Sequence, residues 1–214
     1  RCRSPPRPDA SSPSASCSIG ASVTWSRTTR RPKCSSRFST LPVRDASLPL
    51  SLYYHLPFCE TLCWFCGCTT VITLNHQSSD AYLDYLEKEV ALLAPRLHAD
   101  RRVVQLHYGG GTPTFFQAPQ LRRLDALTRR HFQFAPGAEL SVEIDPRRLA
   151  RTQVAALREG GFTRASLGVQ DFNPKVQEAV HRIQPRALTE QAIDWLRAEG
   201  FTSLNLDLIY GLPY

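Results

Sequence analysis

The chain has 214 residues, and its formal net charge of +7 lies entirely in the first 46 residues, which hold 9 Lys or Arg and 2 Asp or Glu. The remaining residues hold 17 basic and 17 acidic side chains, so this neutral part presents no basic excess for nucleic acid. No run of 18 apolar residues occurs, so the sequence predicts no helix that crosses a membrane.

Residues 1–47 form a head that is rich in Ser, Pro and Arg and lacks the periodicity of a helix or a strand. Its sparse apolar side chains cannot offset the entropy lost on folding, so we expect a disordered head before one domain over residues 48–214. A transit peptide, an anion-binding tail and a gene-model artefact are the alternatives. The chain has no Met, even at position 1, so we expect a fragment or a processed product.

After the head, short apolar runs alternate with segments in which Leu and Val recur three or four residues apart. The first pattern predicts strands and the second predicts helices. In chain order these are strand 50–57, helix 80–95, strand 103–107, helix 119–131, strand 139–144, helix 149–159, strand 164–169, helices 175–181 and 189–199, and strand 204–209.

Strands and helices that alternate at this spacing predict an α/β fold of parallel βα units with right-handed crossovers. Five units fit an open doubly wound sheet or part of a (β/α) barrel, and in both the chemistry lies at the carboxyl ends of the strands. Unusual residues do follow the predicted strands, namely Cys59, residues 109–112, Glu143 with Asp145, Gln170 and Asp207. Because they would converge on one mouth, we favour a partial barrel, truncated after about five βα units.

Four of the seven cysteines lie within residues 59–68, directly after the first predicted strand. Cys59, Cys63 and Cys66 have the spacing Cys-x3-Cys-x2-Cys, and Cys68 follows two residues later. Zinc sites usually add a second, distant pair of Cys or His, and none is apparent here. Three neighbouring thiolates suit a [4Fe–4S] cluster with one iron left open, and a zinc knuckle or a chance grouping is the alternative.

The cysteine spacing resembles the signature of the radical S-adenosylmethionine (SAM) superfamily. A closer resemblance, to the oxygen-independent coproporphyrinogen III oxidases within it, rests on the segments SLYYHLPFCETLCWFCGC, QLHYGGGTPT, VEIDP, LGVQDFN, VHRIQ and LDLIYGLP. The resemblance covers residues 51–213 and leaves out the head.

This resemblance implies a radical SAM barrel that binds a [4Fe–4S] cluster and SAM. Cys59, Cys63 and Cys66 would hold three irons, and the amino and carboxylate groups of SAM would bind the fourth. The residues implied around SAM are Tyr53 and the backbone of Phe65 in contact with it, Gly110, Gly111 and Thr112 at its amino-acid end, and Glu143, Gln170, Arg182 and Asp207 at its carboxylate, ribose or neighbouring groups. Tyr53 is also the candidate catalytic residue.

The reaction implied by the resemblance is an oxidative decarboxylation in haem biosynthesis. An electron enters the cluster and cleaves SAM to methionine and a 5′-deoxyadenosyl radical, which takes hydrogen from a propionate of coproporphyrinogen III. Loss of CO2 and an electron leaves a vinyl group, and two such steps give protoporphyrinogen IX. The implied partners are this substrate and an electron donor similar to flavodoxin or ferredoxin. We expect a monomer in the cytoplasm, or in an organelle if the head is a transit peptide.

The chemistry of single residues supports some of these positions independently. Three glycines after a strand allow close approach to a ligand, although they can also form a simple turn. Asp207 lies within an apolar strand, where an unpaired charge is costly, so we expect a partner or a ligand for it. Arg182 can clamp a carboxylate through two N–H groups. Tyr53 and Tyr54 point to opposite faces of their strand, and the resemblance selects Tyr53, whose face His55 shares.

Two further functions stay open. A haem-binding chaperone of the same superfamily characteristically has Phe where Cys68 stands, so Cys68 favours the enzyme. An inactive fragment is the other alternative, because the predicted barrel lacks a sixth strand and a cover for the substrate. We therefore expect little activity from the isolated chain.

Overall fold

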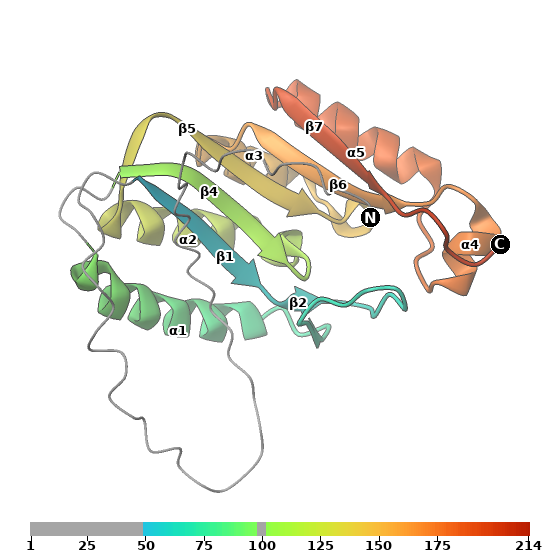
Figure 1. The fold of residues 1–214 in the computed structure, drawn as a ribbon, viewed down its shortest axis with the longest axis horizontal. Coiled ribbons are helices and arrows are strands. Elements are labelled where there is room, and N and C mark those ends of the chain that lie inside the picture. Colours follow the sequence, from blue (N-terminus) through green and yellow to red (C-terminus); the bar gives the residue numbers. More distant parts are fainter. Residues whose placement is uncertain (1–48, 98–101) are drawn as a thin grey trace, which may run out of the picture.

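The computed structural model describes residues 49–97 and 102–214, which are organised around a five-stranded parallel sheet (Figure 1). In sheet order its strands are β1 (Leu50–Leu56), β4 (Arg102–Gly110), β5 (Gln133–Ile144), β6 (Arg164–Gln170) and β7 (Ser203–Leu208). Each strand pairs in parallel with its neighbours, and the order follows the chain without the reversal that marks a doubly wound sheet. The predicted partial barrel is therefore confirmed, whereas the predicted disordered head, residues 1–47, lies outside the described residues.

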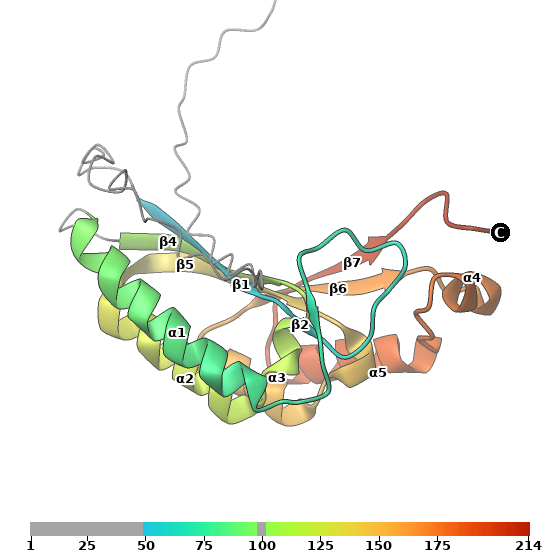
Figure 2. The ribbon, with the colours of Figure 1, turned by 90° about the horizontal axis from the view of Figure 1, so that it is seen from below.

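The helices cover one face of the sheet, and none of the helices in the described residues lies on the other face (Figure 2). Beneath the sheet lie α1 (Ser78–Leu93), α2 (Ala118–His131), α3 (Arg151–Glu159) and α5 (Arg186–Ala198), while the short α4 (Pro174–Ala179) lies beyond the carboxyl end of β6. Short 3₁₀ turns lie in the connections, namely η2 (Ala94–Arg96), η3 (Pro113–Phe115) and η4 (Pro146–Arg148). The uncovered face corresponds to the interior of the barrel.

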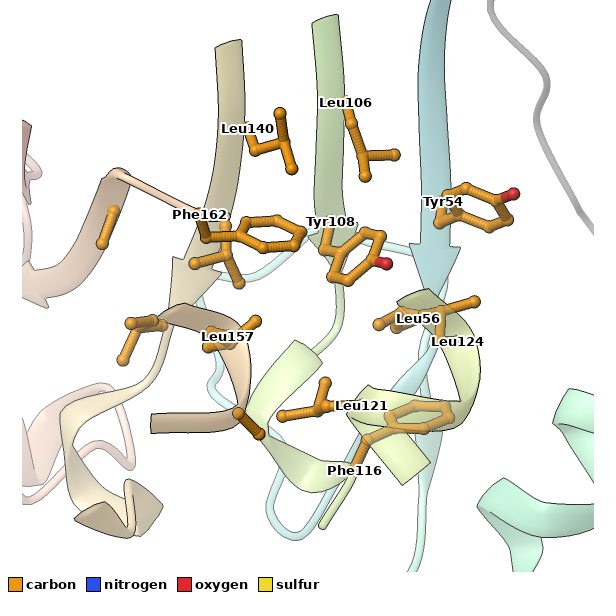
Figure 3. Packing of buried hydrophobic residues seen from close by; sticks show 14 of the residues in the cluster. Tyr54, Leu56, Leu106, Tyr108, Phe116, Leu121, Leu124, Leu140, Leu157 and Phe162 are labelled. Carbon is orange, nitrogen blue, oxygen red and sulfur yellow. The ribbon is translucent and has the colours of Figure 1, made fainter. Parts of the chain in front are cut away.

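The core lies between the sheet and the helices because side chains alternate along each strand. In β1, Leu52, Tyr54 and Leu56 are buried on the helix side, and the residues between them face the open side. The rings of Tyr108 and Phe162 pack with their centroids 4.7 Å apart at the centre of this layer. Figure 3 shows them with other core residues, among them Leu106, Leu121, Leu124, Leu140 and Leu157.

One buried glutamine fixes the turn that follows the glycine-rich segment. Gln153 of α3 donates its side-chain amide to the carbonyl oxygen of Phe116 at 2.9 Å and also to that of Thr114. Its side-chain oxygen accepts from the backbone N–H of Ala150 at 2.7 Å, at the start of α3. This one side chain therefore ties the beginning of α3 to η3, which follows the carboxyl end of β4.

Strand boundaries differ from the predicted ones where the chain is irregular. β5 begins at Gln133 instead of residue 139, because the segment around Pro136 and Gly137 bulges out of register with β4 and breaks the apolar pattern. The short pair β2 (Phe58–Cys59) and β3 (Val71–Ile72) was not predicted, since two residues are too few to show a period. In residues 49–97 and 102–214, no helix is both long enough and apolar enough to span a membrane.

Candidate active site

A cleft at the carboxyl ends of the strands collects most of the predicted site residues. Those that line it are Cys59, Cys63, Phe65, Cys66, Gly110, Gly111, Thr112, Glu143, Gln170, Arg182 and Asp207. Tyr53 is not part of this lining and lies on the open face of β1 beside His107, with ring centroids 5.8 Å apart. The topology thus brings residues separated by up to about 150 positions to one mouth, as expected for parallel strands.

The loop that carries the cysteines is anchored to a distant part of the chain. Trp64 donates its backbone N–H to the carbonyl oxygen of Val180 at 3.0 Å, and its ring stacks on His181 with centroids 5.5 Å apart. The Nδ1 atom of His181 lies 2.8 Å from the carbonyl oxygen of Leu62. These contacts hold the middle of the cysteine loop against the connection between α4 and α5.

The four cysteines of this loop are free thiols, and all four line the cleft. Burial raises the pKa of the Cys59 thiol, although a hydrogen-bonding contact with the Thr112 hydroxyl, 3.4 Å from Sγ, works in the opposite direction. Burial and the neighbouring Cys66 raise the pKa of Cys68 to about 11. Across the part of the chain that the structure describes, no three His, Cys, Asp or Glu side chains gather tightly enough to hold a single metal ion.

A buried charge cluster lies against Cys63. Asp145 accepts hydrogen bonds from the Arg147 guanidinium, the shortest at 2.6 Å, and from Arg182 at 3.2 Å. Both guanidinium groups also point N–H groups at Cys63 Sγ, from 3.5 Å for Arg147 and 3.6 Å for Arg182. Burial opposes the ionisation of Asp145, but its bonds to Arg147 and the charge of Arg182 hold the pKa of this carboxyl below its ordinary value.

The glycine segment after β4 lets the chain pass between crowded side chains. A Cβ at position 109 would lie 3.0 Å from the Tyr53 ring and 3.1 Å from the Glu143 carboxyl carbon. Gly110 has φ +113°, a conformation that L side chains rarely adopt, and a Cβ there would lie 2.7 Å from the His55 ring. Glycine is thus required at this turn, which forms part of the cleft wall.

The Glu143 carboxylate lines the cleft and is held by two donors. One oxygen accepts from the Gly110 backbone N–H at 3.1 Å, and the other lies 3.3 Å from His107 Nε2. The opposite ring nitrogen of His107 lies 2.8 Å from the Ser141 hydroxyl, and the ring stacks on Tyr53. Burial, followed by the charge of Glu143, raises the pKa of the Tyr53 phenol. Tyr53 and His55 lie on the same face of β1, toward the barrel interior, and the Tyr53 hydroxyl lies 3.2 Å from His55 Nδ1.

Asp207 lies in the cleft and has hydrogen-bonding partners, as its place in an apolar strand led us to expect, although its side chain is exposed. β7 pairs only with β6 among the described strands, and Asp207 is exposed on it. Its carboxylate accepts from the hydroxyl of Ser166 at 2.6 Å and from the amide of Asn205 at 2.7 Å. Gln170 ends β6 with φ +69°, which turns the chain away from the sheet beside this cluster.

Three residues of the site were not predicted from the sequence. Arg147 contacts Cys63, His107 contacts Glu143, and Ser166 contacts Asp207. The signal for His107 and Ser166 was available, because each lies only a few residues before the end of its strand and on the face that points away from the core. No comparable signal exists for Arg147, whose direction depends on the η4 turn.

Comparisons with known proteins agree with this geometry. Residues 53–214 match the sequence profile of the Radical SAM superfamily. The oxygen-independent coproporphyrinogen III oxidases of Salmonella typhimurium and Synechocystis are 50% and 48% identical over 165 and 166 residues, 77% and 78% of this chain. The structure of coproporphyrinogen III oxidase from Escherichia coli superposes with a TM-score of 0.76 at 49% identity, covering 79% of this chain and 39% of that one. The chain spans 36% of the length of these two curated relatives.

Proposed function

The chain belongs to the radical SAM superfamily, and on that premise we propose that it is the cofactor-binding part of an oxygen-independent coproporphyrinogen III oxidase. The observation that carries the proposal is a cleft in which three cysteines, a glycine turn and the polar ends of three strands, β5, β6 and β7, meet. Identity of about half to enzymes of that name over 77–78% of the chain supports the choice within the superfamily.

The residues of the cleft fit the two cofactors of the superfamily, a [4Fe–4S] cluster and SAM. Cys59, Cys63 and Cys66 would hold the cluster, because three free thiols spread along one wall can each bind a different iron. Guanidinium N–H groups of Arg147 and Arg182 already point at the Cys63 sulfur. The turn that only glycine can adopt, at Gly110, places the backbone of Gly110 and Gly111 in the wall of the same cleft.

When bound, these cofactors supply one-electron chemistry that removes a hydrogen atom from an unactivated carbon of the substrate. In the proposed reaction, each of two propionates of coproporphyrinogen III loses CO2, a hydrogen atom that the SAM chemistry removes and an electron that passes to a one-electron acceptor, and a vinyl group remains. A flavodoxin-like or ferredoxin-like protein would supply the electron for the cluster. The free thiols of the loop suit a reducing compartment, which supports the cytoplasm as the location.

The polar residues of the cleft would bind and orient SAM. Glu143 can accept hydrogen bonds from its ammonium group, because Gly110 and His107 hold the carboxylate in place from behind. Asp207 and Ser166 form a hydrogen-bonded pair at the rim that can bind ribose hydroxyls. Arg182 can pair with the carboxylate of SAM while its Nη2 stays bonded to the carbonyl oxygen of Gly168 at 2.7 Å.

Anaerobic turnover tests the proposal. The protein is reconstituted with iron and sulfide and then given SAM, a reductant and coproporphyrinogen III. We expect methionine, 5′-deoxyadenosine and protoporphyrinogen IX at a low rate, because the chain spans 36% of the length of its relatives, and none of these from Cys63→Ala. Tight haem binding with no decarboxylation would instead identify the haem-binding chaperone. Cys68 speaks against that alternative, since the chaperone characteristically has Phe at this position, and here its thiol lines the cleft.

A further inference from the structure

Arg147 is a charged residue of the cleft wall to which neither the sequence motifs nor the proposed SAM contacts give a role. It lies in η4, and its side chain is only 15% exposed. Asp145 fixes it through three groups, since the carboxylate accepts from the backbone N–H at 3.0 Å, from Nε at 3.0 Å and from Nη2 at 2.6 Å. The guanidinium is therefore held in one orientation before any ligand binds.

That orientation aims the guanidinium at a cysteine. The Nη2 group of Arg147 lies 3.5 Å from Cys63 Sγ, within hydrogen-bonding distance for sulfur. Arg182 approaches the same sulfur at 3.6 Å, but it also bonds to Gly168 and is the proposed partner of the SAM carboxylate. Among the described residues of the cleft, the Arg147 guanidinium bonds to Asp145 and Cys63, so its contact with the sulfur does not compete with cofactor binding.

The charges around the contact between Arg147 and Cys63 would favour reduction of a cluster bound there. One surplus positive charge remains on the cluster of Asp145, Arg147 and Arg182. All three side chains are largely buried, and water screens charge weakly there. Reduction of an iron–sulfur cluster adds negative charge that the ligating sulfurs share. Hydrogen bonds and fixed positive charge at those sulfurs therefore favour the reduced state.

We propose that Arg147, which Asp145 holds in place, is a positioning residue for Cys63. By donating an N–H to the Cys63 sulfur, Arg147 raises the reduction potential of the cluster. The inference rests on the proposed function, because it requires the cluster. A purely structural role for the Asp145–Arg147 pair would affect stability and leave the potential of an assembled cluster unchanged.

Redox titration of the reconstituted protein, followed by electron paramagnetic resonance of the reduced cluster, separates the two roles. At the wild-type midpoint, Arg147→Gln should lower the ratio of reduced to oxidised cluster about tenfold, a shift of about 59 mV to more negative potential for a one-electron couple. Arg147→Lys keeps the charge but loses the rigid fork, so its shift should have the same direction and be smaller.

Arg122→Gln is the matched control, because it removes one positive charge from an exposed ion pair with Glu159 on the helix side of the sheet. It should leave the midpoint at the wild-type value. Equal midpoints for wild type, Arg147→Gln and Arg147→Lys would overturn the inference, and so would an equal shift in the control. If Arg147→Gln cannot be loaded with a cluster, Arg147→Lys decides alone. A wild-type protein that takes up no cluster would refute the proposed function itself, whereas a normal cluster with unchanged midpoints refutes only the role of Arg147.

Discussion

Replacing Gly111 with Ala tests whether the glycine turn holds the cysteine loop in place. A Cβ at this position would lie 2.8 Å from the carbonyl oxygens of both Pro57 and Phe58. The same stretch is already bonded to the turn, since the N–H of Gly111 donates to the Leu56 oxygen at 2.9 Å and that of Thr112 to the Phe58 oxygen at 2.8 Å. The methyl group therefore meets backbone on both sides, and the turn must move away from the β1–β2 junction.

Overpacking of this kind costs about 1–3 kcal/mol. In a chain of this size, each kcal/mol lowers the melting temperature by about 2–4 °C, so Gly111→Ala should melt roughly 2–12 °C below wild type. Because β2 carries Cys59, the displaced turn should also reduce the iron bound per chain after reconstitution.

Gly67→Ala is the control within the same loop. Gly67 lies between Cys66 and Cys68, and a Cβ there would have no atom within 4 Å. Thermal unfolding followed by circular dichroism, together with iron analysis, measures both effects. The reasoning fails if Gly111→Ala matches wild type in melting temperature and iron content, or if Gly67→Ala loses as much as Gly111→Ala.

Three other substitutions test the site and the core. Cys63→Ala should abolish the broad visible absorbance of the reconstituted protein, whereas Cys68→Ala should keep it, because Cys63 is one of the three proposed iron ligands and Cys68 is not. Equal loss of absorbance in both variants would contradict this division. Glu89→Gln should stabilise the fold near neutral pH, because burial raises the pKa of the Glu89 carboxyl, so that ionisation favours the unfolded chain. The stability gain of Glu89→Gln over wild type should be present above the raised pKa of Glu89 in the folded chain and vanish below its pKa in the unfolded chain, about 4.3. Urea titrations on both sides of that range measure the gain, and a gain that does not change with pH would contradict the reasoning. Phe162→Ala should cost about 3–5 kcal/mol in denaturant unfolding, because its buried ring packs on Tyr108, and a loss below about 1 kcal/mol would contradict the packing.

The position of the cleft was predictable because parallel strands bring their carboxyl ends to one edge. Glu143 and Gln170 could be placed there from the strand pattern alone, without any knowledge of their contacts. Alternation predicted only that Tyr53 and Tyr54 point to opposite faces, and the family resemblance was needed to select Tyr53; Tyr54 is the one buried against the helices. Local periodicity and topology are therefore sufficient to place the strand ends, but not to choose between two adjacent tyrosines.

Other features depend on neighbours that the sequence pattern does not specify. Asp207 was expected to need a partner because it lies in an apolar strand, but its exposure could not be predicted, since it depends on β7 having only β6 beside it among the described strands. The contact between Arg147 and Cys63 spans 84 positions and depends on how Asp145 turns a three-residue helix. The start of β5 depends on a bulge, whose register is set by pairing with β4 and not by its own residues.

The anchoring of the cysteine loop also constrains the order of events during synthesis. Leu62 and His181, whose contact fixes the loop, are 119 residues apart. A ribosome adds about 5–20 residues per second, so the cysteines leave the exit tunnel roughly 6–24 s before the segment that holds them. During that interval the nascent chain carries the cysteine thiols but has not yet formed the contact between Leu62 and His181. Insertion of iron and sulfide into a fixed site must therefore await emergence of the α4–α5 connection, which makes a reducing environment important while the polypeptide is still being made.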